Sequence, residues 1–111
     1  MERFVRISLL FDFYGQMLTE KQRQAVELHY GMDLSLSEIA EELGVSRQAV
    51  HDLLKRSEEA LEQYEARLRL AERWTAQQAR ILELRQLLRA LVDEGDERWQ
   101  QVFGLLGEMT K

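Results

Sequence analysis

The 111-residue sequence contains no cysteine and no proline. The absence of cysteine excludes disulfides, thiolate catalysis and cysteine-type zinc sites, and it fits a reducing compartment. No run of about 18 apolar residues is present, so we expect no membrane span. The apolar N-terminal segment is interrupted by Asp12 and is followed by no small-residue cleavage site, so we predict a cytoplasmic protein without a signal peptide.

Basic residues are also scarce: 15 lysines and arginines stand against 20 aspartates and glutamates, which gives a net charge of −5. Non-specific affinity for nucleic acids comes mostly from neutralisation of phosphates by Lys and Arg. The charge balance therefore counts against a strong nucleic-acid binder. A nucleic-acid ligand requires basic groups gathered on one face; the alternative is that a nucleic acid is contacted weakly or not at all. An apolar content of 45% with 32% charged residues is nevertheless typical of a folded domain.

The most informative stretch is residues 34–56, LSLSEIAEELGVSRQAVHDLLKR. Ser35 and Glu38 have the spacing of a capping box at the start of a helix. Gly44 is placed to end that helix in the left-handed conformation, and Ser46 is placed to cap the next one. Two capped helices joined by a glycine turn predict a helix-turn-helix, whose second helix normally enters the major groove of DNA.

Two further helices are predicted before this unit. Residues 3–14 repeat large apolar residues at i, i+3 and i+4, which predicts a helix that ends at Gly15 and is buried in the core or in a dimer interface. Thr19 and Gln22 form a second capping-box pattern, which opens a helix that ends at Gly31.

The chain after Ser46 has no glycine until Gly95. Apolar residues recur at alternating steps of four and three, which predicts that the second helix continues to Arg73 with a stripe that needs a partner. The stripe consists of Val50, Leu54, Ser57, Leu61, Tyr64, Leu68 and Ala71, of which only Ser57 is polar.

A break is predicted near Trp74, because Thr75 and Gln78 form a third capping-box pattern; a helix that is continuous through this point is the alternative. A second apolar stripe follows in a helix that Gly95 is predicted to end, and Asp96 is placed to cap a last helix. The second stripe consists of Ile81, Leu84, Leu88 and Leu91.

These helices predict an all-α protein in two parts. Residues 1–73 would hold a helix-turn-helix domain with an N-terminal helix and a long recognition helix, and residues 74–111 would form a C-terminal helical extension. The later stripes could fold back as a hairpin of the same chain or pair between two chains. A monomer of this length has too little chain to cover the N-terminal stripe and both later stripes at once, so we expect a homodimer.

Six residues at the start of the second helix are the candidates for nucleic-acid contact: Ser46, Arg47, Gln48, His51, Lys55 and Arg56. Arg suits guanine and Gln suits adenine in bidentate contacts, and a helix start at Ser46 suits a phosphate. Asp52 beside them repels phosphate or requires a cytosine amino group. The alternative is that Arg47 and Gln48 are ordinary solvated residues and that Lys55 and Arg56 pair with carboxylates at helical spacing.

The sequence contains no pattern of catalytic or metal-ligating residues. His29 and His51 are the only histidines and fall in different predicted helices, without a spacing such as HExxH. The glycines are scattered and end helices rather than form a phosphate loop, and no nucleophile lies beside a base. We therefore predict neither a cofactor, nor a metal site, nor enzymatic activity.

Two protein families share these motifs. Residues 18–61 resemble region four of bacterial sigma factors, a helix-turn-helix that reads promoter DNA, through LTEKQRQAVELHYG, SLSEIAEELGVSRQAV and the basic pair Lys55 and Arg56. The closer resemblance is to the YlxM family of small bacterial proteins. It is carried by LLFDFYGQMLTEKQRQ at residues 9–24, SLSEIAEELGVSRQAVHDLLKR at residues 35–56 and LEQYEARL at residues 61–68.

The resemblance to YlxM proteins implies a sigma-like helix-turn-helix with extra helices. It also implies a role as an accessory or regulatory protein of the signal recognition particle, in co-translational protein targeting. The partners it implies are DNA, the particle's RNA or the particle's GTPase. The alternative function is a sequence-specific, DNA-binding regulator of transcription.

Overall fold

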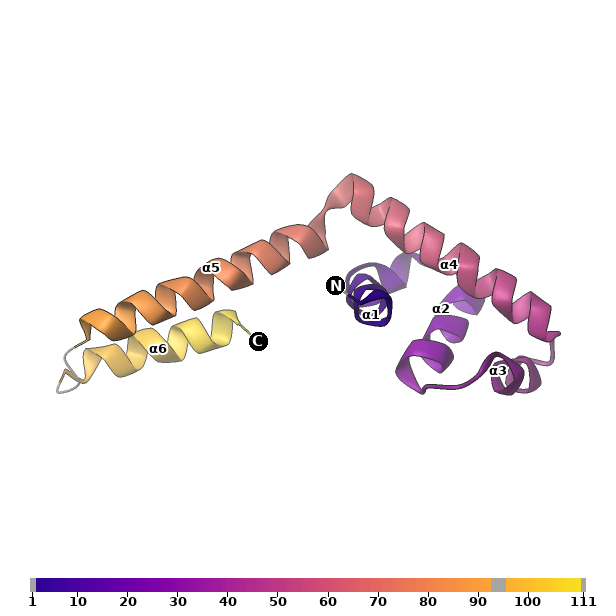
Figure 1. Ribbon diagram of the computed structural model, residues 1–111, viewed down its shortest axis with the longest axis horizontal. Coiled ribbons are helices and arrows are strands. Elements are labelled where there is room, and N and C mark those ends of the chain that lie inside the picture. Colours follow the sequence, from indigo (N-terminus) through magenta and orange to yellow (C-terminus); the bar gives the residue numbers. More distant parts are fainter. Residues whose placement is uncertain (1, 93–95, 111) are drawn as a thin grey trace. The chain divides into compact units, whose positions relative to one another are not determined.

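The computed structural model describes residues 2–92 and 96–110 of the chain, and all regular elements in these ranges are helices (Figure 1). The predicted all-α class is therefore confirmed. The chain divides into two compact units, Met1–Ala71 and Glu72–Lys111, each of which is described by itself. No helix in the described ranges is long and apolar enough to cross a membrane.

The first unit is built around one long helix, α4, which packs against three shorter helices (Figure 1). The predicted helix at residues 3–14 is confirmed as α1, and Gly15 follows it because a Cβ there would lie only 2.9 Å from Cε2 of Phe11. The elements in order are α1 (Arg3–Tyr14), the 3-10 turn η1 (Gly15–Met17), α2 (Glu20–Val26), the π-helical turn η2 (Glu27–Gly31), α3 (Leu36–Leu43) and α4 (Arg47–Leu68).

Local capping fixes the helix-turn-helix as predicted. The Ser35 hydroxyl accepts the N–H of Glu38 at 3.1 Å, and the Glu38 carboxylate accepts the N–H of Ser35 at 3.1 Å. The second of these bonds holds the pKa of Glu38 below its usual value. Gly44 ends α3 with a φ of 68°, and the Ser46 hydroxyl starts α4 by accepting the N–H of Ala49 at 3.0 Å.

The helix predicted from Thr19 to Gly31 is confirmed at both ends but changes type in its middle. Thr19 and Gln22 form the predicted capping box at the start of α2. The hydrogen bonding then widens into the π-helical turn η2, a type of turn that is frequent at functional sites. This turn brings Tyr30 to α4, where its hydroxyl donates to Glu58.

The apolar stripe of α4 is buried against other helices of the same unit. Val50, Ser57 and Leu61 are fully buried, and the stripe packs with residues of α1, α2 and α3. The partner that this stripe was expected to need is therefore part of the same chain, because α1 and α2 cover it. The other large members of this core are Ile7, Leu10, Tyr14, Leu18, Val26, Ile39 and Leu54.

The break after the long helix lies earlier than predicted, at Arg69. Helix α4 ends at Leu68, Arg69 takes a left-handed φ of 55°, and α5 runs over Leu70–Leu91. Trp74 and Thr75 lie inside α5, so the predicted break near Trp74 and the capping box at Thr75 are wrong.

A buried pair of polar side chains explains why the break between α4 and α5 lies at Arg69. The Tyr14 hydroxyl donates to Oε1 of Glu65 at 2.6 Å and accepts the N–H of Leu70 at 3.0 Å. Oε1 of Glu65 also accepts the N–H of Ala71 at 3.1 Å. These bonds satisfy the first N–H groups of α5, which the start of a helix otherwise leaves unpaired. A cap built from side chains distant in sequence therefore prevails over the local pattern at Thr75.

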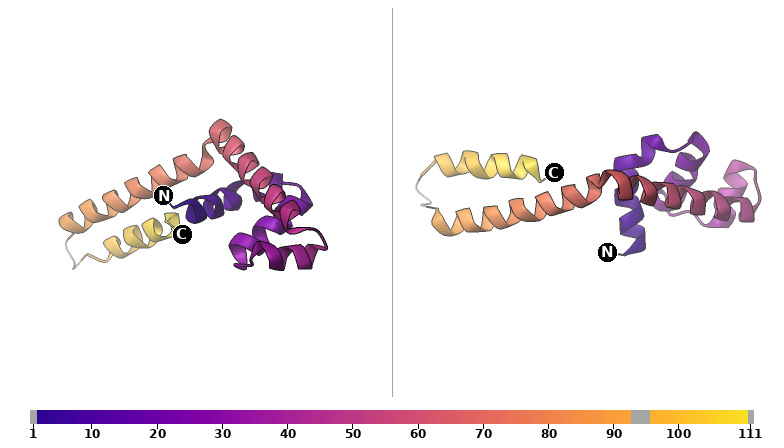
Figure 2. Two further views of the ribbon diagram at one scale, coloured as in Figure 1. Left: turned by 45° about the vertical axis from the view of Figure 1, so that its right-hand side comes forward. Right: turned by 90° about the horizontal axis from the view of Figure 1, so that it is seen from above.

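The second unit is an antiparallel hairpin of α5 and α6 (Arg98–Met109), which lie side by side in both views of Figure 2. Nε2 of Gln78 donates to the carbonyl oxygen of Met109 at 3.0 Å. Closer to the turn, the guanidinium carbon of Arg89 lies 5.0 Å from the centre of the Phe103 ring. These contacts fix which faces of the two helices meet.

At the start of α6, Oδ1 of Asp96 accepts the N–H of Arg98 at 3.0 Å, in agreement with the predicted capping role. The residue that directly precedes the helix is Glu97, whose side chain makes no capping bond. The predicted helix end at Gly95 lies outside the described residues.

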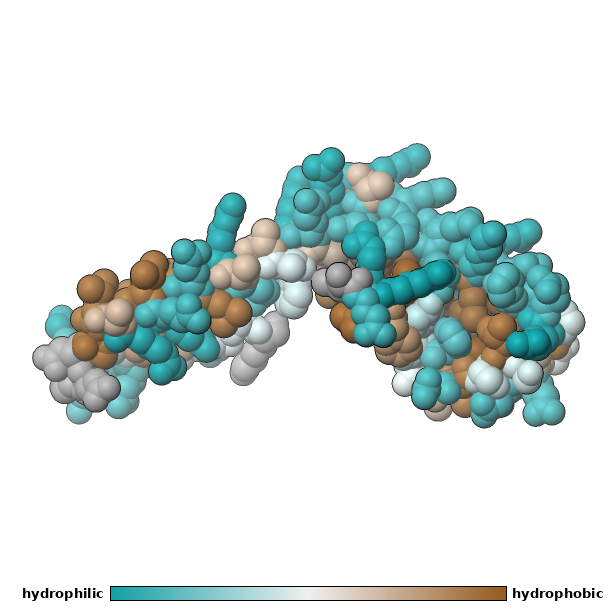
Figure 3. Space-filling model, in the orientation of Figure 1, coloured by the Kyte–Doolittle hydropathy of each residue, from teal (hydrophilic) through white to brown (hydrophobic). Residues whose placement is uncertain are grey.

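Few apolar side chains are buried between α5 and α6. In the described part of this unit the large buried apolar residues are Ile81 and Leu106. Hydrophobic residues reach the surface along the hairpin (Figure 3). The exposed ones include Leu82, Leu84, Leu87, Leu91, Leu105 and Met109.

Candidate nucleic-acid interface

The six predicted contact residues are all exposed, at the cap and in the first turns of α4. Ser46 is the N-cap, so its hydroxyl oxygen is already engaged by the N–H of Ala49. The remaining five are Arg47, Gln48, His51, Lys55 and Arg56. The outer surface of the second helix of the helix-turn-helix is therefore open to a partner.

The structure sorts these residues into two rows. Arg47, His51 and Lys55 follow one another at i, i+4 and i+8, and we call them the basic ridge. Gln48 and Arg56 belong to the neighbouring row, with Asp52 between them, and we call this the mixed ridge. The basic ridge carries the positive charge along one line, which is the arrangement that a net charge of −5 requires for contact with a polyanion.

The main partner of Asp52 is Gln48 of the mixed ridge. Its Oδ1 accepts a hydrogen bond from Nε2 of Gln48 at 3.1 Å. The same oxygen lies 3.5 Å from Nδ1 of His51, and both side chains are 57% exposed. A pair this long and exposed is worth little, so His51 stays available to a ligand.

Glu58 lies three residues beyond Lys55, and two other residues already bind its carboxylate. Nη2 of Arg3 lies 2.6 Å from Oε2, and the Tyr30 hydroxyl donates to Oε1. Burial, together with this bond, raises the pKa of Tyr30, so Tyr30 remains a donor across the physiological range. Glu58 thus pairs with Arg3 of α1 instead of Lys55, contrary to the alternative in which Lys55 is held by neighbouring carboxylates.

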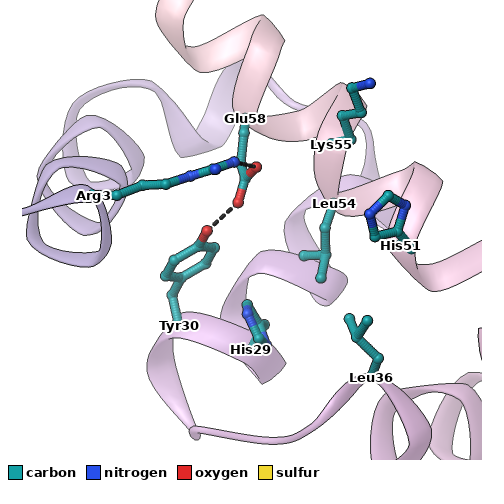
Figure 4. A pocket seen from close by; sticks show the side chains of 8 residues that line it. All are labelled: Arg3, His29, Tyr30, Leu36, His51, Leu54, Lys55 and Glu58. Atoms are coloured by element: carbon teal, nitrogen blue, oxygen red, sulfur yellow. Dashed lines mark hydrogen bonds and ion pairs between the residues drawn. The ribbon is translucent and has the colours of Figure 1, made fainter.

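A hollow lies beside the basic ridge, between η2 and α4 (Figure 4). We call it the histidine hollow, because both histidines of the chain line it. Its lining residues are Arg3, His29, Tyr30, Leu36, His51, Leu54, Lys55 and Glu58. A neighbouring hollow shares Leu36 and His51 and is otherwise lined by Arg47 and Gln48. Every residue of the basic ridge therefore lines at least one of the two hollows.

Arg56 faces a different part of the surface. The hollow that it lines lies on the other flank of α4 and includes Lys21 of α2, Asp52 and apolar residues of the turn. Of the six predicted residues, Arg56 is therefore the one that the structure separates from the basic ridge.

Sequence reasoning missed three residues of this surface: Arg3, His29 and Tyr30. Their distance in sequence from α4 hid the contacts, and the π-helical turn that carries His29 and Tyr30 has no recognised sequence signal. The residues in ELHYG were assigned only to the end of a helix. As for metal ligands, the described residues contain no group of three or more His, Cys, Asp or Glu side chains placed to hold an ion.

Comparison with known proteins gives one consistent result. The sequence model of the UPF0122 family, helix-turn-helix proteins like YlxM and p13, matches residues 1–100. A UPF0122 protein of Desulforamulus reducens is 49% identical over 88 residues, which cover 79% of this chain and 75% of the relative. A UPF0122 protein of Bacillus mycoides is 50% identical over 88 residues, with 79% and 80% covered, and one of Bacillus cereus is 49% identical with the same coverage.

Proposed function

Because the chain belongs to the UPF0122 family of YlxM/p13-like helix-turn-helix proteins, we propose that it is a regulatory protein that binds duplex DNA through α4. The observation that carries the proposal is the basic ridge: Arg47, His51 and Lys55 are exposed in line on the second helix of the helix-turn-helix. Of the two carboxylates that follow Lys55, Glu58 is already paired with Arg3, and Glu59 is exposed.

The roles follow from the position of each residue. Arg47 and Gln48 at the leading turn reach base edges, where Arg recognises guanine and Gln recognises adenine. Lys55, two turns further along, meets the phosphate backbone, and the resemblance to sigma region four supports duplex DNA as the ligand. Arg56 contributes less, because it lies on the other flank of α4 beside Asp52.

A binding titration with a genomic library of DNA duplexes at low salt tests this proposal. Arg47→Ala should weaken binding to selected sequences by about 1–3 kcal/mol, the discrimination that a bidentate base contact provides. Arg67→Ala is the matched control, since Arg67 is an exposed arginine in the last turn of the same helix. Equal effects of the two substitutions would contradict a recognition role for Arg47.

A second candidate function follows from the resemblance to YlxM proteins: an accessory role beside the GTPase or the RNA of the signal recognition particle. The net charge of −5 favours this candidate, because an acidic protein surface suits a basic protein partner. Titration of the purified GTPase and of the particle's RNA, each alone, separates the two candidates. Binding of the GTPase that Arg47→Ala leaves unchanged would support the accessory role.

We further propose that the two parts of the chain have different roles: residues 1–73 contact the ligand, and residues 74–111 join two copies into a homodimer. Leu84, Leu87 and Leu91 form an exposed stripe on α5, and Leu105 and Met109 form one on α6. At about 100° per residue, the members of each stripe fall on one side of their own helix. Two such hairpins related by a two-fold axis would bury them in a four-helix bundle.

A second copy of the chain suits this surface because the positive and negative charges of the hairpin nearly balance. Residues 72–111 carry six Lys or Arg and seven Asp or Glu, so two hairpins do not repel each other strongly. A mass measurement in solution tests the dimer. A monomeric mass at high protein concentration, or a dimer that Leu87→Glu leaves intact, would exclude this interface.

A further inference from the structure

The histidine hollow combines groups that suit an anion. One wall is η2 with His29 and Tyr30, and the other is α4 with His51 and Lys55 (Figure 4). Within the described part of the chain, the one carboxylate that lines it is Glu58, which Arg3 and Tyr30 occupy. The apolar side chains of Leu36 and Leu54 complete the lining, so the hollow offers positive charge beside an apolar surface.

His29 is held in one tautomer. Its Nδ1 lies 2.9 Å from the carbonyl oxygen of Leu34. A carbonyl oxygen only accepts hydrogen bonds, so Nδ1 carries a hydrogen and Nε2 is the ring atom that gains or loses a proton. A neutral His29 therefore offers an acceptor at Nε2, and a protonated His29 offers a donor and a positive charge.

The charged groups that line the hollow leave one net positive charge, that of Lys55, and Asp52 lies outside the lining. Arg3 from α1 and Glu58 from α4 neutralise each other, and Tyr30 from η2 is an uncharged donor. Leu36 from α3 brings no charge. Asp52 lies beside His51 at the outer edge, at 3.5 Å. Lys55 has no ion-pair partner among the residues that the structure describes, so its charge is available to a ligand.

We propose that the histidine hollow binds a phosphate group, with Lys55 and protonated His51 as direct contacts, and that protonation of His29 adds a third donor. The ligand is a phosphate because the hollow adjoins a helix-turn-helix face that would carry a phosphate at regular intervals along bound DNA. A bound phosphate stabilises the protonated form of each imidazole, so phosphate uptake is coupled to proton uptake. The inference rests on the proposed function, because the backbone of bound DNA would supply the phosphate group. A free phosphomonoester is the other molecule that could supply it.

The first experiment follows the two imidazoles directly by NMR in the wild-type chain. Two histidines give two C2–H resonances, which His29→Gln and His51→Gln assign. Addition of duplex DNA, inorganic phosphate or a nucleoside monophosphate should move both resonances toward their protonated positions. A response to DNA alone identifies the backbone as the source, and a response to the free phosphates identifies a small ligand. Unmoved resonances with all three ligands would overturn the proposal.

The second experiment measures the pH dependence of DNA affinity at constant ionic strength. Between about pH 8 and pH 6 the wild-type affinity should rise about threefold to tenfold, because up to one proton per histidine is taken up on binding. The double variant His29→Gln/His51→Gln should lose this rise, and Lys55→Gln should weaken binding at every pH. Arg67→Gln is the control with the same loss of charge at the far end of α4.

The outcomes separate this inference from the proposed function. DNA binding that keeps its full pH dependence in the double variant would refute the histidine hollow while leaving DNA binding in place. An absence of DNA binding at low salt, together with imidazole resonances that respond to free phosphate, would refute the proposed function and support the hollow. Circular dichroism of each variant confirms that the helices remain folded.

Discussion

The two units of the chain are both helical but differ in how completely they bury their own apolar surface. In the first unit, α1, α2 and α3 enclose one face of α4, and Leu10, Ile39 and Leu61 are fully buried. In the hairpin of α5 and α6, Leu87 remains 58% exposed and Leu91 77% exposed. Exposed apolar side chains occur in both units, but the first unit buries a large core, whereas the described part of the hairpin buries only Ile81 and Leu106 as large apolar residues.

The two units also differ in how well their buried polar groups are hydrogen-bonded. In the first unit Tyr14 and Glu65 bond to each other and to the first N–H groups of α5. In the hairpin Nε of Arg85 is buried without a hydrogen-bond partner among the described residues. Unpaired buried donors are uncommon in folded domains, so the hairpin is the unit whose buried polar groups are less completely satisfied.

The largest expected effect compares one leucine from each unit. Leu61→Ala should cost about 2–5 kcal/mol of unfolding free energy at any protein concentration, because it leaves a cavity in a closed core. Leu87→Ala should cost little at low concentration and more as concentration rises, if the proposed dimer buries Leu87. Urea unfolding at several concentrations checks this. Concentration-independent and equally large losses would abolish the distinction between the units.

The next effect concerns the cap that ends the first unit. Tyr14→Phe removes a buried hydroxyl from Glu65 and Leu70 and should cost about 1–3 kcal/mol, whereas Tyr64→Phe removes only a bond of 3.3 Å to the Met17 carbonyl oxygen. Equal losses for the two tyrosines, in chemical denaturation, would contradict a special role for the buried cap.

Burial, and then the bond to Glu65, raises the pKa of Tyr14, which gives this prediction a pH dependence. The stabilisation is fully present below the ordinary tyrosine pKa of about 10 and is lost as the pH rises through the higher folded value. The advantage of the wild type over Tyr14→Phe should therefore shrink only in strongly alkaline solution.

A smaller effect compares two identical patterns, one in each unit. Ser35→Ala removes a true N-cap and should cost about 1 kcal/mol. Thr75→Ala changes the same type of residue in the same sequence pattern, but inside α5, and should change stability by less than about 0.5 kcal/mol. Thermal unfolding of both variants checks the comparison. A loss at Thr75 as large as at Ser35 would show that α5 begins at Thr75 in solution.

The smallest effect is the acid response of the first unit. The bond from the Ser35 N–H lowers the pKa of Glu38, so its stabilisation is present above the ordinary glutamate pKa of about 4.3 and is lost as the pH falls through the lower folded value. Between about pH 4 and pH 2 the wild type should lose more stability than Glu38→Gln. Glu41→Gln, on the exposed side of the same helix, should follow the wild type.

Local signals were sufficient to predict the helix-turn-helix. Ser35, Gly44 and Ser46 act through partners within three or four residues, so their roles are readable from spacing alone. The break at Arg69 was missed because its cause is the pair of Tyr14 and Glu65, which are 51 residues apart. The stripe on α4 predicted a buried face correctly, but periodicity does not reveal whether the same chain or a second copy covers it.

The candidate site was predictable to the same extent. The exposed row on α4 follows from the helix start at Ser46, so the positions of Arg47, His51 and Lys55 along it could be predicted. The pairing of Glu58 with Arg3, 55 residues away, and the position of His29 across from His51 depend on tertiary packing. The sequence therefore predicted the residues of the basic ridge but not the hollow beside it.

The most direct test of the central claim is the salt dependence of DNA affinity for the wild type, Lys55→Gln and Arg67→Gln. Each phosphate contact contributes about −0.9 to the slope of log affinity against log salt. We predict that Lys55→Gln makes the slope shallower by about 0.9 and that Arg67→Gln leaves it unchanged. The same slope for all three proteins, or no binding at low salt, would contradict a DNA-binding role for the basic ridge.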